Sequence, residues 1–261
     1  FFGVIIADAA GWRISLGSWA LVSLVGALPW LLVLPVARRR NRAEALLDSG
    51  LIPVVVPVSL FRSPTALSVM GIFAVSGTMA YTWFALLPQL LVDQAGFSLE
   101  QAAFALGIFT ITGFPMSLII PPLATNPRWA GAIVALAVAC GLGGMIGLLV
   151  APEVATVLWV VLLALGPMTF PLSLTLIGLR TENHMSALAL SGFVNKVGYF
   201  IAAVGPLIAG VLVQVTGEWT SSVVFLMVIV VCEIPAVWVL ARNGNVDREL
   251  RAHADSAHLS N

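Results

Sequence analysis

Residues 129–150 have the sequence WAGAIVALAVACGLGGMIGLLV, which contains no charged side chain. Its length is close to the roughly 20 apolar residues that an α-helix needs to cross about 30 Å of hydrocarbon. A solid apolar block favours a helix over a strand, because the strands of a transmembrane barrel alternate apolar and polar residues over about ten positions. The stretch therefore predicts a membrane-spanning helix.

Six more apolar blocks of similar length lie between the charged parts of the chain. They occupy residues 14–36, 65–92, 101–122, 155–178, 187–214 and 219–241. Residues 1–7 are also apolar but too few to cross a bilayer, and we interpret them as the stump of a further helix of a larger protein. The sequence thus predicts an all-α fold, a polytopic membrane helical bundle with seven spans and a stump.

The composition supports this fold class and excludes several others. The chain is 60% apolar and 9% charged, whereas soluble domains are about 45–50% apolar and about 25% charged. A disordered chain, a secreted disulfide scaffold and a nucleic-acid binder are excluded. A soluble enzyme would have too few polar groups to cover its surface.

Motifs for bond-making chemistry are missing from the sequence. There is no zinc-ligand spacing, no phosphate-binding loop and no nucleophile elbow. We therefore expect no cofactor, no metal and no catalytic residue. The expected partners are the lipid bilayer and a small-molecule solute that crosses it, and no nucleic acid.

The arginines predict how the spans are oriented. Connections on one side of the predicted topology hold ten basic residues, against Arg13 alone on the other side. The ten are Arg38, Arg39, Arg40, Arg42, Arg62, Arg128, Arg180, Arg242, Arg248 and Arg251. Because basic loops stay in the cytoplasm, we expect a multi-pass protein of the cell inner (plasma) membrane with a cytoplasmic C-terminus.

Residues 38–64 form the one long connection between predicted spans, and they begin with Arg38-Arg39-Arg40-Asn41-Arg42. This segment is either a flexible linker or a basic anchor on anionic lipid, which would contribute about 1 kcal/mol per arginine near the surface. Under either interpretation it marks a boundary between two bundles.

Two charged residues, Lys196 and Glu233, lie inside predicted spans. Each costs about 2.5–3.5 kcal/mol at the centre of a bilayer unless it has a partner or a water path. Counting along consecutive antiparallel helices places both roughly 12–14 Å from the cytoplasmic surface. The sequence predicts an ion pair between them. It leaves open whether the pair joins two helices, whether one or both charges bind a substrate or proton, or whether Lys196 snorkels to the headgroups.

Polar groups near these charges indicate a site in the bundle. Gly192, Lys196, Tyr199 and Ala203 share one helical face, with Asn195 beside it, and such a face lines a cavity or a tight helix contact. The span 155–178 is interrupted by Gly166-Pro167, with Thr169 nearby. Broken helices at mid-membrane point to the binding sites of transporters, although a simple packing kink is the alternative. Tyr81 also lies near mid-span, so its hydroxyl needs a partner or a ligand.

Several short motifs resemble the major facilitator superfamily. They are Gly11-Trp12-Arg13, the run Phe170-Pro171-Leu172-Ser173-Leu174-Thr175-Leu176-Ile177-Gly178-Leu179-Arg180, then Ser191-Gly192-Phe193, Val197-Gly198-Tyr199, Gly205-Pro206 and Thr216-Gly217. Within the superfamily, the chain resembles the cyanate-permease-like group, which also includes 2-nitroimidazole transporters. The resemblance extends to about residue 242.

The resemblance implies the end of the fifth helix and the sixth helix of a twelve-helix transporter in residues 1–37. It implies a cytoplasmic central loop in 38–64, the C-terminal six-helix bundle in 65–241 and a cytoplasmic tail in 242–261. The missing partner would then be the N-terminal half-bundle. Alternating access between two half-bundles would move the solute, whereas the alternative function is a non-transporting membrane anchor or sensor subunit.

In that family scheme, helices seven, eight, ten and eleven contribute to the central path. This assigns substrate binding to Tyr81, Thr169, Phe170, Asn195, Lys196 and Tyr199, and makes Glu233 a scaffold residue of a peripheral helix. The chain departs from its group at Asn195-Lys196, where the group tends to have neutral residues. A cation at this place suits a small anion such as cyanate or a carboxylate, unless Glu233 neutralises it.

Overall fold

The computed structural model describes residues 11–27, 29 and 57–259. The chain divides into two compact units, residues 1–53 and 54–261. The described part of the first unit contains a helix over residues 12–27, which covers the beginning of the predicted span 14–36. The rest of that span, the predicted stump and most of the predicted connection 38–64 lie outside the described residues.

The described part of the second unit, residues 57–259, contains six helical segments that are long and apolar enough to cross a membrane. They are α3 (Pro64–Ala95), α4 (Leu99–Ala124), α5 (Pro127–Val150), α6 to α7 (Thr156–Leu179), α8 (His184–Thr216) and α9 to α10 (Trp219–Ala241). These bounds agree with the predicted spans within about three residues at each end. The all-helical prediction is confirmed, because the described residues contain helices and no strand.

Two of the spans are interrupted. The predicted break at Gly166-Pro167 is present, with α6 (Thr156–Leu165), a 3₁₀ turn η2 (Gly166–Met168) and α7 (Thr169–Leu179). The last span, predicted as one helix, is also divided, into α9 (Trp219–Val231) and α10 (Ile234–Ala241). Pro235 accounts for this second break, because it has no N–H to donate to the carbonyl one turn earlier.

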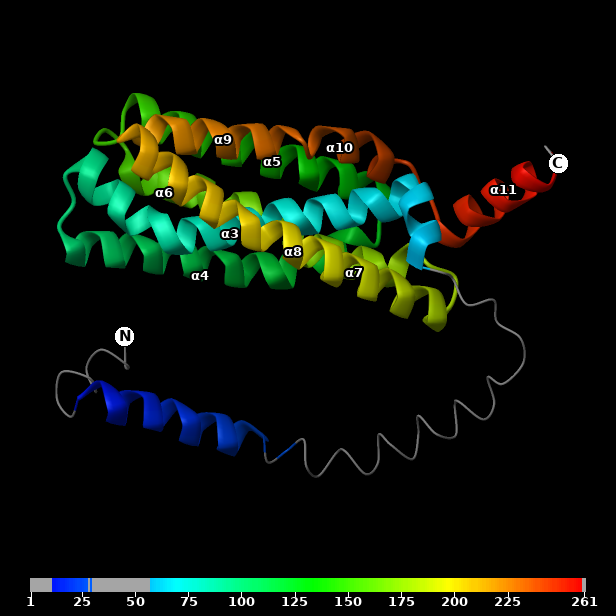
Figure 1. Cartoon of the computed structure of the whole chain (residues 1–261), viewed down its shortest axis with the longest axis horizontal. Coiled ribbons are helices and arrows are strands. Elements are labelled where there is room, and N and C mark those ends of the chain that lie inside the picture. Colours follow the sequence, from blue (N-terminus) through cyan, green and yellow to red (C-terminus); the bar gives the residue numbers. More distant parts are fainter. Residues whose placement is uncertain (1–10, 28, 30–56, 260–261) are drawn as a thin grey trace. The chain divides into compact units, whose positions relative to one another are not determined.

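The helix ends are fixed by local hydrogen bonds that the sequence supplies. Ser63 accepts from the N–H of Ala66 at the start of α3, and Ser98 forms a reciprocal capping box with Gln101 at the start of α4. Gly96 and Gly217 end α3 and α8 with φ of 65° and 72°, a conformation that glycine adopts without strain. These caps keep the turns between spans short, so consecutive spans run in opposite directions (Figure 1).

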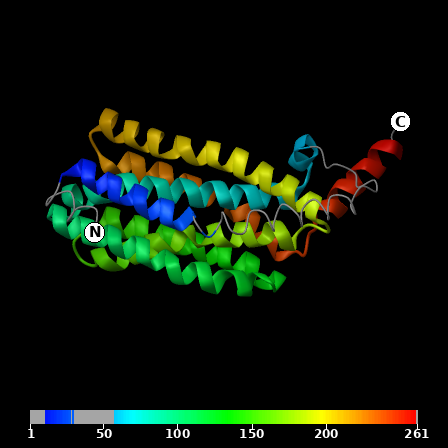
Figure 2. The same ribbon diagram turned by 90° about the horizontal axis from the view of Figure 1, so that it is seen from below.

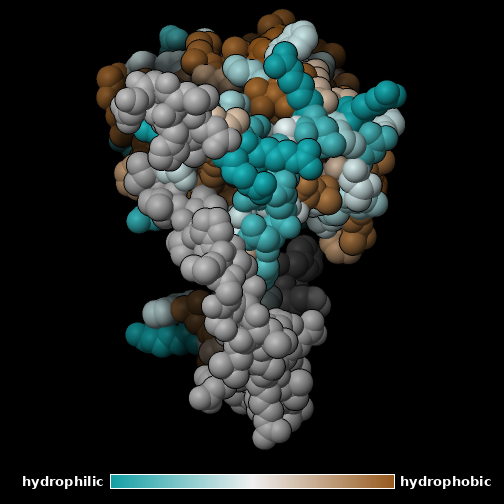
Figure 3. Space-filling view, turned by 90° about the vertical axis from the view of Figure 1, so that its right-hand side faces the viewer, coloured by the Kyte–Doolittle hydropathy of each residue, from teal (hydrophilic) through white to brown (hydrophobic). Residues whose placement is uncertain are grey.

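The arginines of the second unit gather at one end of the bundle, which we call the arginine end. It carries the turns α4–α5, α7–α8 and α10–α11 together with the short helix η1 (Pro57–Arg62), as Figure 1 shows. Arg62, Arg128, Arg180 and Arg242 lie there. Figure 3 views this end, where hydrophilic side chains gather between hydrophobic sides. The predicted tail 242–261 contains a helix, α11 (Val246–Leu259).

The most extensive helix contact in the bundle is that between α3 and α8, which lie along one another (Figures 1 and 2). Glycines on α8 permit this approach. A Cβ added at Gly198 would lie 2.4 Å from Cδ1 of Phe73, and one added at Gly205 would lie 2.2 Å from Cγ2 of Thr78. Small residues at helix contacts let backbones approach closely in membranes, where no hydrophobic force drives helices together.

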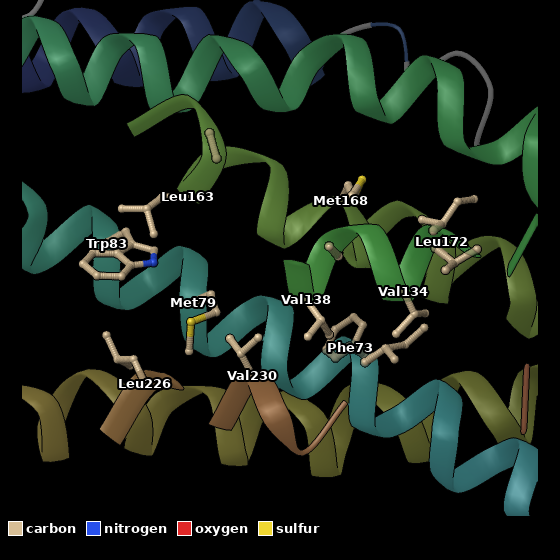
Figure 4. Packing of buried hydrophobic residues seen from close by; sticks show 14 of the residues in the cluster. Phe73, Met79, Trp83, Val134, Val138, Leu163, Met168, Leu172, Leu226 and Val230 are labelled. Atoms are coloured by element: carbon tan, nitrogen blue, oxygen red, sulfur yellow. The ribbon is translucent and has the colours of Figure 1, made fainter. Parts of the chain in front are cut away.

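Apolar side chains from α3, α5, α6, α7 and α9 fill the centre of the bundle. Figure 4 shows Phe73, Met79 and Trp83 of α3 facing side chains of the other helices, such as Leu163 and Val230. The apolar stretches of α4 and α8, in contrast, are mostly exposed. Phe104 on α4 is 73% exposed and Phe200 on α8 is 74% exposed. The core therefore leaves the outer faces of α4 and α8 available to lipid or to protein.

We expect Gly205→Ala to destabilise the bundle, because its methyl group would overlap Thr78. Overpacking of this kind costs about 1–3 kcal/mol. Gly210→Ala on the same helix is the matched control, since nothing lies within 4 Å of its added Cβ and alanine gains up to about 1 kcal/mol of helix propensity. Thermal unfolding in detergent, followed by circular dichroism, should give a lower midpoint for Gly205→Ala only; equal midpoints would contradict the close contact.

Candidate functional site

An aromatic cluster joins three helices at the place where site residues were predicted. The ring of Phe73 on α3 lies 5.1 Å from the ring of Phe170 on α7 and 4.9 Å from that of Tyr199 on α8, the latter edge to face. Such pairs contribute about 0.5–1.5 kcal/mol beyond the area that they bury. The structure thus brings Phe170 and Tyr199 together through Phe73, a fully buried residue that the sequence analysis missed.

The phenol groups of Tyr81 and Tyr199 lie close enough to interact with one another. Both side chains are partly exposed, at 43% and 41%. The phenol of Tyr199 is therefore the polar neighbour of Tyr81 in the middle of its span. The two hydroxyls present a polar edge beside the aromatic cluster.

Asn195 and Lys196 continue this surface along α8, one turn before Tyr199. The amide nitrogen of Asn195 donates to the carbonyl oxygen of Ser191 at 2.8 Å and to its Oγ at 3.2 Å, which fixes the orientation of the amide. The side chain of Lys196 is exposed. Asn195, Lys196, Tyr199 and Tyr81 thus form one partly polar surface on α3 and α8.

The predicted ion pair between Lys196 and Glu233 is not formed. Glu233 is 3% exposed and faces the interior of the bundle, whereas Lys196 lies on the exposed face of α8. Ion pairs are formed instead by Glu182, which contacts Arg248 and Arg251. Both residues were expected at the same depth, but depth along the axis does not determine which face of a helix a side chain occupies.

Thr169 lies away from the partly polar surface, although it was predicted with it. Its side chain is fully buried, and its hydroxyl lies 3.3 Å from Oε1 of Glu233 and 3.5 Å from the carbonyl oxygen of Ile72. The neighbouring residue, Phe170, belongs to the aromatic cluster. The start of α7 therefore contacts the cluster with one residue and the buried carboxyl group with the other.

A separate cavity of about 440 Å³ lies between α3, α8 and α9. Its lining is almost entirely apolar, with Phe200, Ile201, Ile208, Phe225 and Ile229 among its residues. Such a lining suits a hydrocarbon chain and offers little to a charged solute. In the described ranges 11–27, 29 and 57–259, no cluster of three metal-ligating side chains is present.

A polar network closes the arginine end, and the sequence analysis did not predict it. The guanidinium of Arg180 donates to Oδ1 of Asn243 at 2.7 Å, to the carbonyl of Gly244 at 3.2 Å and to the carbonyl of Leu240 at 2.9 Å. Burial lowers the pKa of Arg180, while the nearby Glu249 carboxylate acts in the opposite direction. Through these hydrogen bonds, the side chain of Arg180 satisfies carbonyl groups at and just after the end of α10.

Acidic residues of α11 complete this network. Glu249 accepts from Oγ of Ser63 and Oγ1 of Thr65, each at 2.5 Å, and Asp247 accepts from Ser186 and from the N–H of Glu182. The first turn of α11 is thus bonded to the beginnings of α3 and α8. The predicted tail thus includes a helix that is bonded to the ends of other helices.

Glu182 makes the outermost contacts of the network. Hydrogen bonds from Arg248 and Arg251 hold its pKa below the ordinary value of 4.5. A lowered pKa means that the contacts stabilise α11 fully above that ordinary value and are lost as the pH falls through the lowered one. The side chains are exposed, so the contribution is small and decreases with salt.

Comparison with known proteins places this six-helix membrane bundle in a family. Residues 1–203 match the model of the Major Facilitator Superfamily. The chain belongs to this superfamily, as the sequence motifs had indicated, and its six spans are part of a major facilitator bundle.

Three curated relatives are similar over long stretches. An uncharacterized transporter of Bacillus subtilis (strain 168), YycB, is 29% identical over 83% of this chain and 52% of its own length. A 2-nitroimidazole transporter of Escherichia coli (strain K12) is 31% identical over 74% of this chain and 48% of its own. A putative anionic 4-hydroxy-benzoate permease of Thauera aromatica is 34% identical over 40% of this chain and 63% of its own. The chain spans about half the length of the first two.

We expect Arg180→Ala to release α11 from the bundle. The substitution leaves carbonyls of Leu240 and Gly244 without their donor, and an unsatisfied buried group costs about 1–3 kcal/mol, roughly a tenfold change in an opening equilibrium. Limited proteolysis should cut the connection between α10 and α11 about ten times faster than in the unchanged chain. Arg242→Ala, at a neighbouring exposed position, should not alter the cleavage rate. If both substitutions accelerated cleavage equally, the hydrogen bonds of Arg180 would not be what holds α11 in place.

Proposed function

We propose that this chain forms the C-terminal half of a secondary active transporter for a small anionic or heterocyclic solute, cyanate or a related compound among them. Membership of the superfamily and three relatives named as transporters or a permease support the class of activity. Two of these names specify a nitroimidazole and an anionic hydroxybenzoate. Both are small planar compounds with polar substituents.

The observation that carries the proposal is the surface shared by α3 and α8. It presents the two phenol hydroxyls of Tyr81 and Tyr199, the exposed Lys196 and the fixed amide of Asn195, next to the rings of Phe73 and Phe170. The aromatic faces open to a planar ring are those of the exposed Tyr199 and the partly buried Phe170, while the buried Phe73 supports them from behind. An ammonium group attracts an anion. Among the described residues no carboxylate lies within ion-pair distance of Lys196, so its charge is available to a solute.

We propose that a second half-bundle completes the path. The relatives are about twice as long as the matched part of this chain, and α4 and α8 present mostly exposed apolar faces. A half-bundle that covers these faces would enclose the partly polar surface between the two halves. Movement of one half against the other would then open the site to either side of the membrane in turn.

The proposed orientation places the arginine end and α11 in the cytoplasm of the cell that makes the protein, in its inner (plasma) membrane. To test it, single cysteines would be introduced at Thr125 and Arg242 of the arginine end and at Glu153 of the other end, all exposed positions. A membrane-impermeant maleimide added to intact cells should label Glu153→Cys at least tenfold more than the other two variants. Labelling of Thr125→Cys or Arg242→Cys in intact cells would reverse the orientation.

For the solute itself, we expect Lys196→Ala to reduce uptake of 4-hydroxybenzoate about tenfold, which corresponds to about 1.4 kcal/mol. Uptake of its uncharged analogue 4-hydroxybenzamide should fall less than twofold, because only the anion uses the charge. Lys196→Arg should keep most anion uptake, and Arg128→Ala, a distant exposed cation, serves as the control. Equal losses for anion and amide would exclude Lys196 from the solute site.

A further inference from the structure

Glu233 is a carboxyl group buried at the point where the last span is broken. It lies between α9 and α10, and 3% of its surface is exposed. A cavity of about 10 Å³ borders it, lined also by Ser76, Met79, Trp83 and Gly166. Figure 4 shows Met79 and Trp83 in this part of the core. A cavity of this size has room for about one water molecule.

A second helix break meets the same carboxyl group. Thr169 begins α7 directly after the turn η2, and its hydroxyl lies 3.3 Å from Oε1 of Glu233. Interruptions of two spans thus converge on one ionisable side chain. Broken helices inside a membrane are tolerated where protein or water satisfies their backbone groups, and an ionisable residue at such a place is expected to have a function.

No cation compensates this carboxyl group among the described residues. The titratable side chains on the membrane-spanning parts of the surrounding helices are Tyr81 on α3, Cys140 on α5, and Lys196 and Tyr199 on α8, with Cys232 adjacent in the chain. None of them has a hydrogen bond or ion pair with Glu233; its polar side-chain partner is Thr169. An uncompensated carboxylate in an apolar interior is strongly unfavourable, so this conformation favours the neutral acid.

The hydroxyl of Thr169 connects the protonation of Glu233 to its surroundings. It lies between Oε1 of Glu233, at 3.3 Å, and the carbonyl oxygen of Ile72, at 3.5 Å, and it has one hydrogen to donate. When Glu233 is neutral, its O–H can donate to Thr169 while Thr169 donates to Ile72. When Glu233 has lost its proton, Thr169 must donate to the carboxylate and release Ile72.

Both backbone positions involved are next to the aromatic cluster. Ile72 precedes Phe73, and Thr169 precedes Phe170, whose rings lie 5.1 Å apart. A change in the hydrogen bonds of Ile72 and Thr169 therefore acts on the two residues that support Tyr199 and the proposed solute surface. The carboxyl group of Glu233 is thus connected to the proposed solute site through hydrogen bonds to Thr169 and Ile72.

We propose that Glu233 is a proton-binding site that couples solute movement to proton movement, a proposal that rests on the transport function above. The carboxylic acid carries one proton when it is enclosed as in this structure. It releases that proton to water, as carboxylate and H⁺, when the bundle rearranges and opens the site. Thr169 is the positioning residue that links this exchange to Phe170.

The test uses the full-length protein as it is produced in its native cell, purified and reconstituted in vesicles. It compares two modes of transport of labelled 4-hydroxybenzoate. One mode is accumulation driven by a pH gradient, and the other is exchange of internal labelled for external unlabelled solute without a gradient. Glu233→Gln keeps a neutral side chain but cannot release a proton. We expect the ratio of gradient-driven accumulation to exchange to fall at least tenfold in Glu233→Gln, with Glu153→Gln, an exposed position, as the matched control.

Either of two results would overturn the proposal. One is a ratio of accumulation to exchange in Glu233→Gln that equals the ratio in the unchanged protein. The other is a loss of accumulation and exchange in equal proportion, which is expected of a scaffold residue. A positioning role for Thr169 predicts that Thr169→Val shifts the pH at which accumulation is half-maximal, whereas Thr175→Val, elsewhere on α7, leaves it in place.

A second measurement does not depend on transport. Infrared difference spectra between acid and alkaline pH should contain a carboxylic acid band that disappears in Glu233→Gln and remains in Glu153→Gln. Identical spectra for Glu233→Gln and the unchanged protein would show that Glu233 does not exchange a proton. If the unchanged protein exchanges no labelled solute but the band is present, the proposed transport of this solute is refuted, whereas the proton-binding site at Glu233 is still supported.

Discussion

The close contact between α3 and α8 is the constraint on which the rest of the structure depends. Gly198 and Gly205 leave no room for a Cβ against Phe73 and Thr78. This contact fixes the rotation of α8, so that its buried stripe faces α3 while Lys196 and Tyr199 lie on exposed parts of its surface. In a bilayer, where apolar side chains gain little by leaving lipid, such close backbone packing is what holds two helices at one register.

The helix breaks add polar function to a bundle whose core is otherwise apolar. Between its ends, a continuous helix satisfies its backbone groups internally and presents only side chains. The interruptions before Thr169 and at Glu233 bring a hydroxyl, a carboxyl group and the carbonyl of Ile72 to one place. Ile72 and Thr169 directly precede Phe73 and Phe170 of the aromatic cluster. The proposed proton site and the proposed solute surface therefore involve neighbouring residues of α3 and α7.

The arginine end shows a different solution to the same problem of unsatisfied polar groups. Helix ends have carbonyls and N–H groups without internal partners, and Arg180, Asp247 and Glu249 supply partners for several of them. The network connects α11 to the beginnings of α3 and α8. A charged segment that follows the last span is therefore part of the folded unit, although its composition resembles that of a solvated tail.

Long uncharged blocks such as 129–150 determined the number and length of the described spans, because a bilayer requires about 20 apolar residues to cross it. Gly166-Pro167 determined one break, and short motifs such as the run that ends at Arg180 determined the family. The positions of Lys196 and Glu233 along their spans, however, did not determine whether they meet. Pro235 likewise determined the second break, although it was not predicted. The face that each side chain occupies and the inclusion of Phe73 in the site were decided by tertiary packing. Rotation about a helix axis depends on contacts such as Gly198 against Phe73, which join residues far apart in the chain.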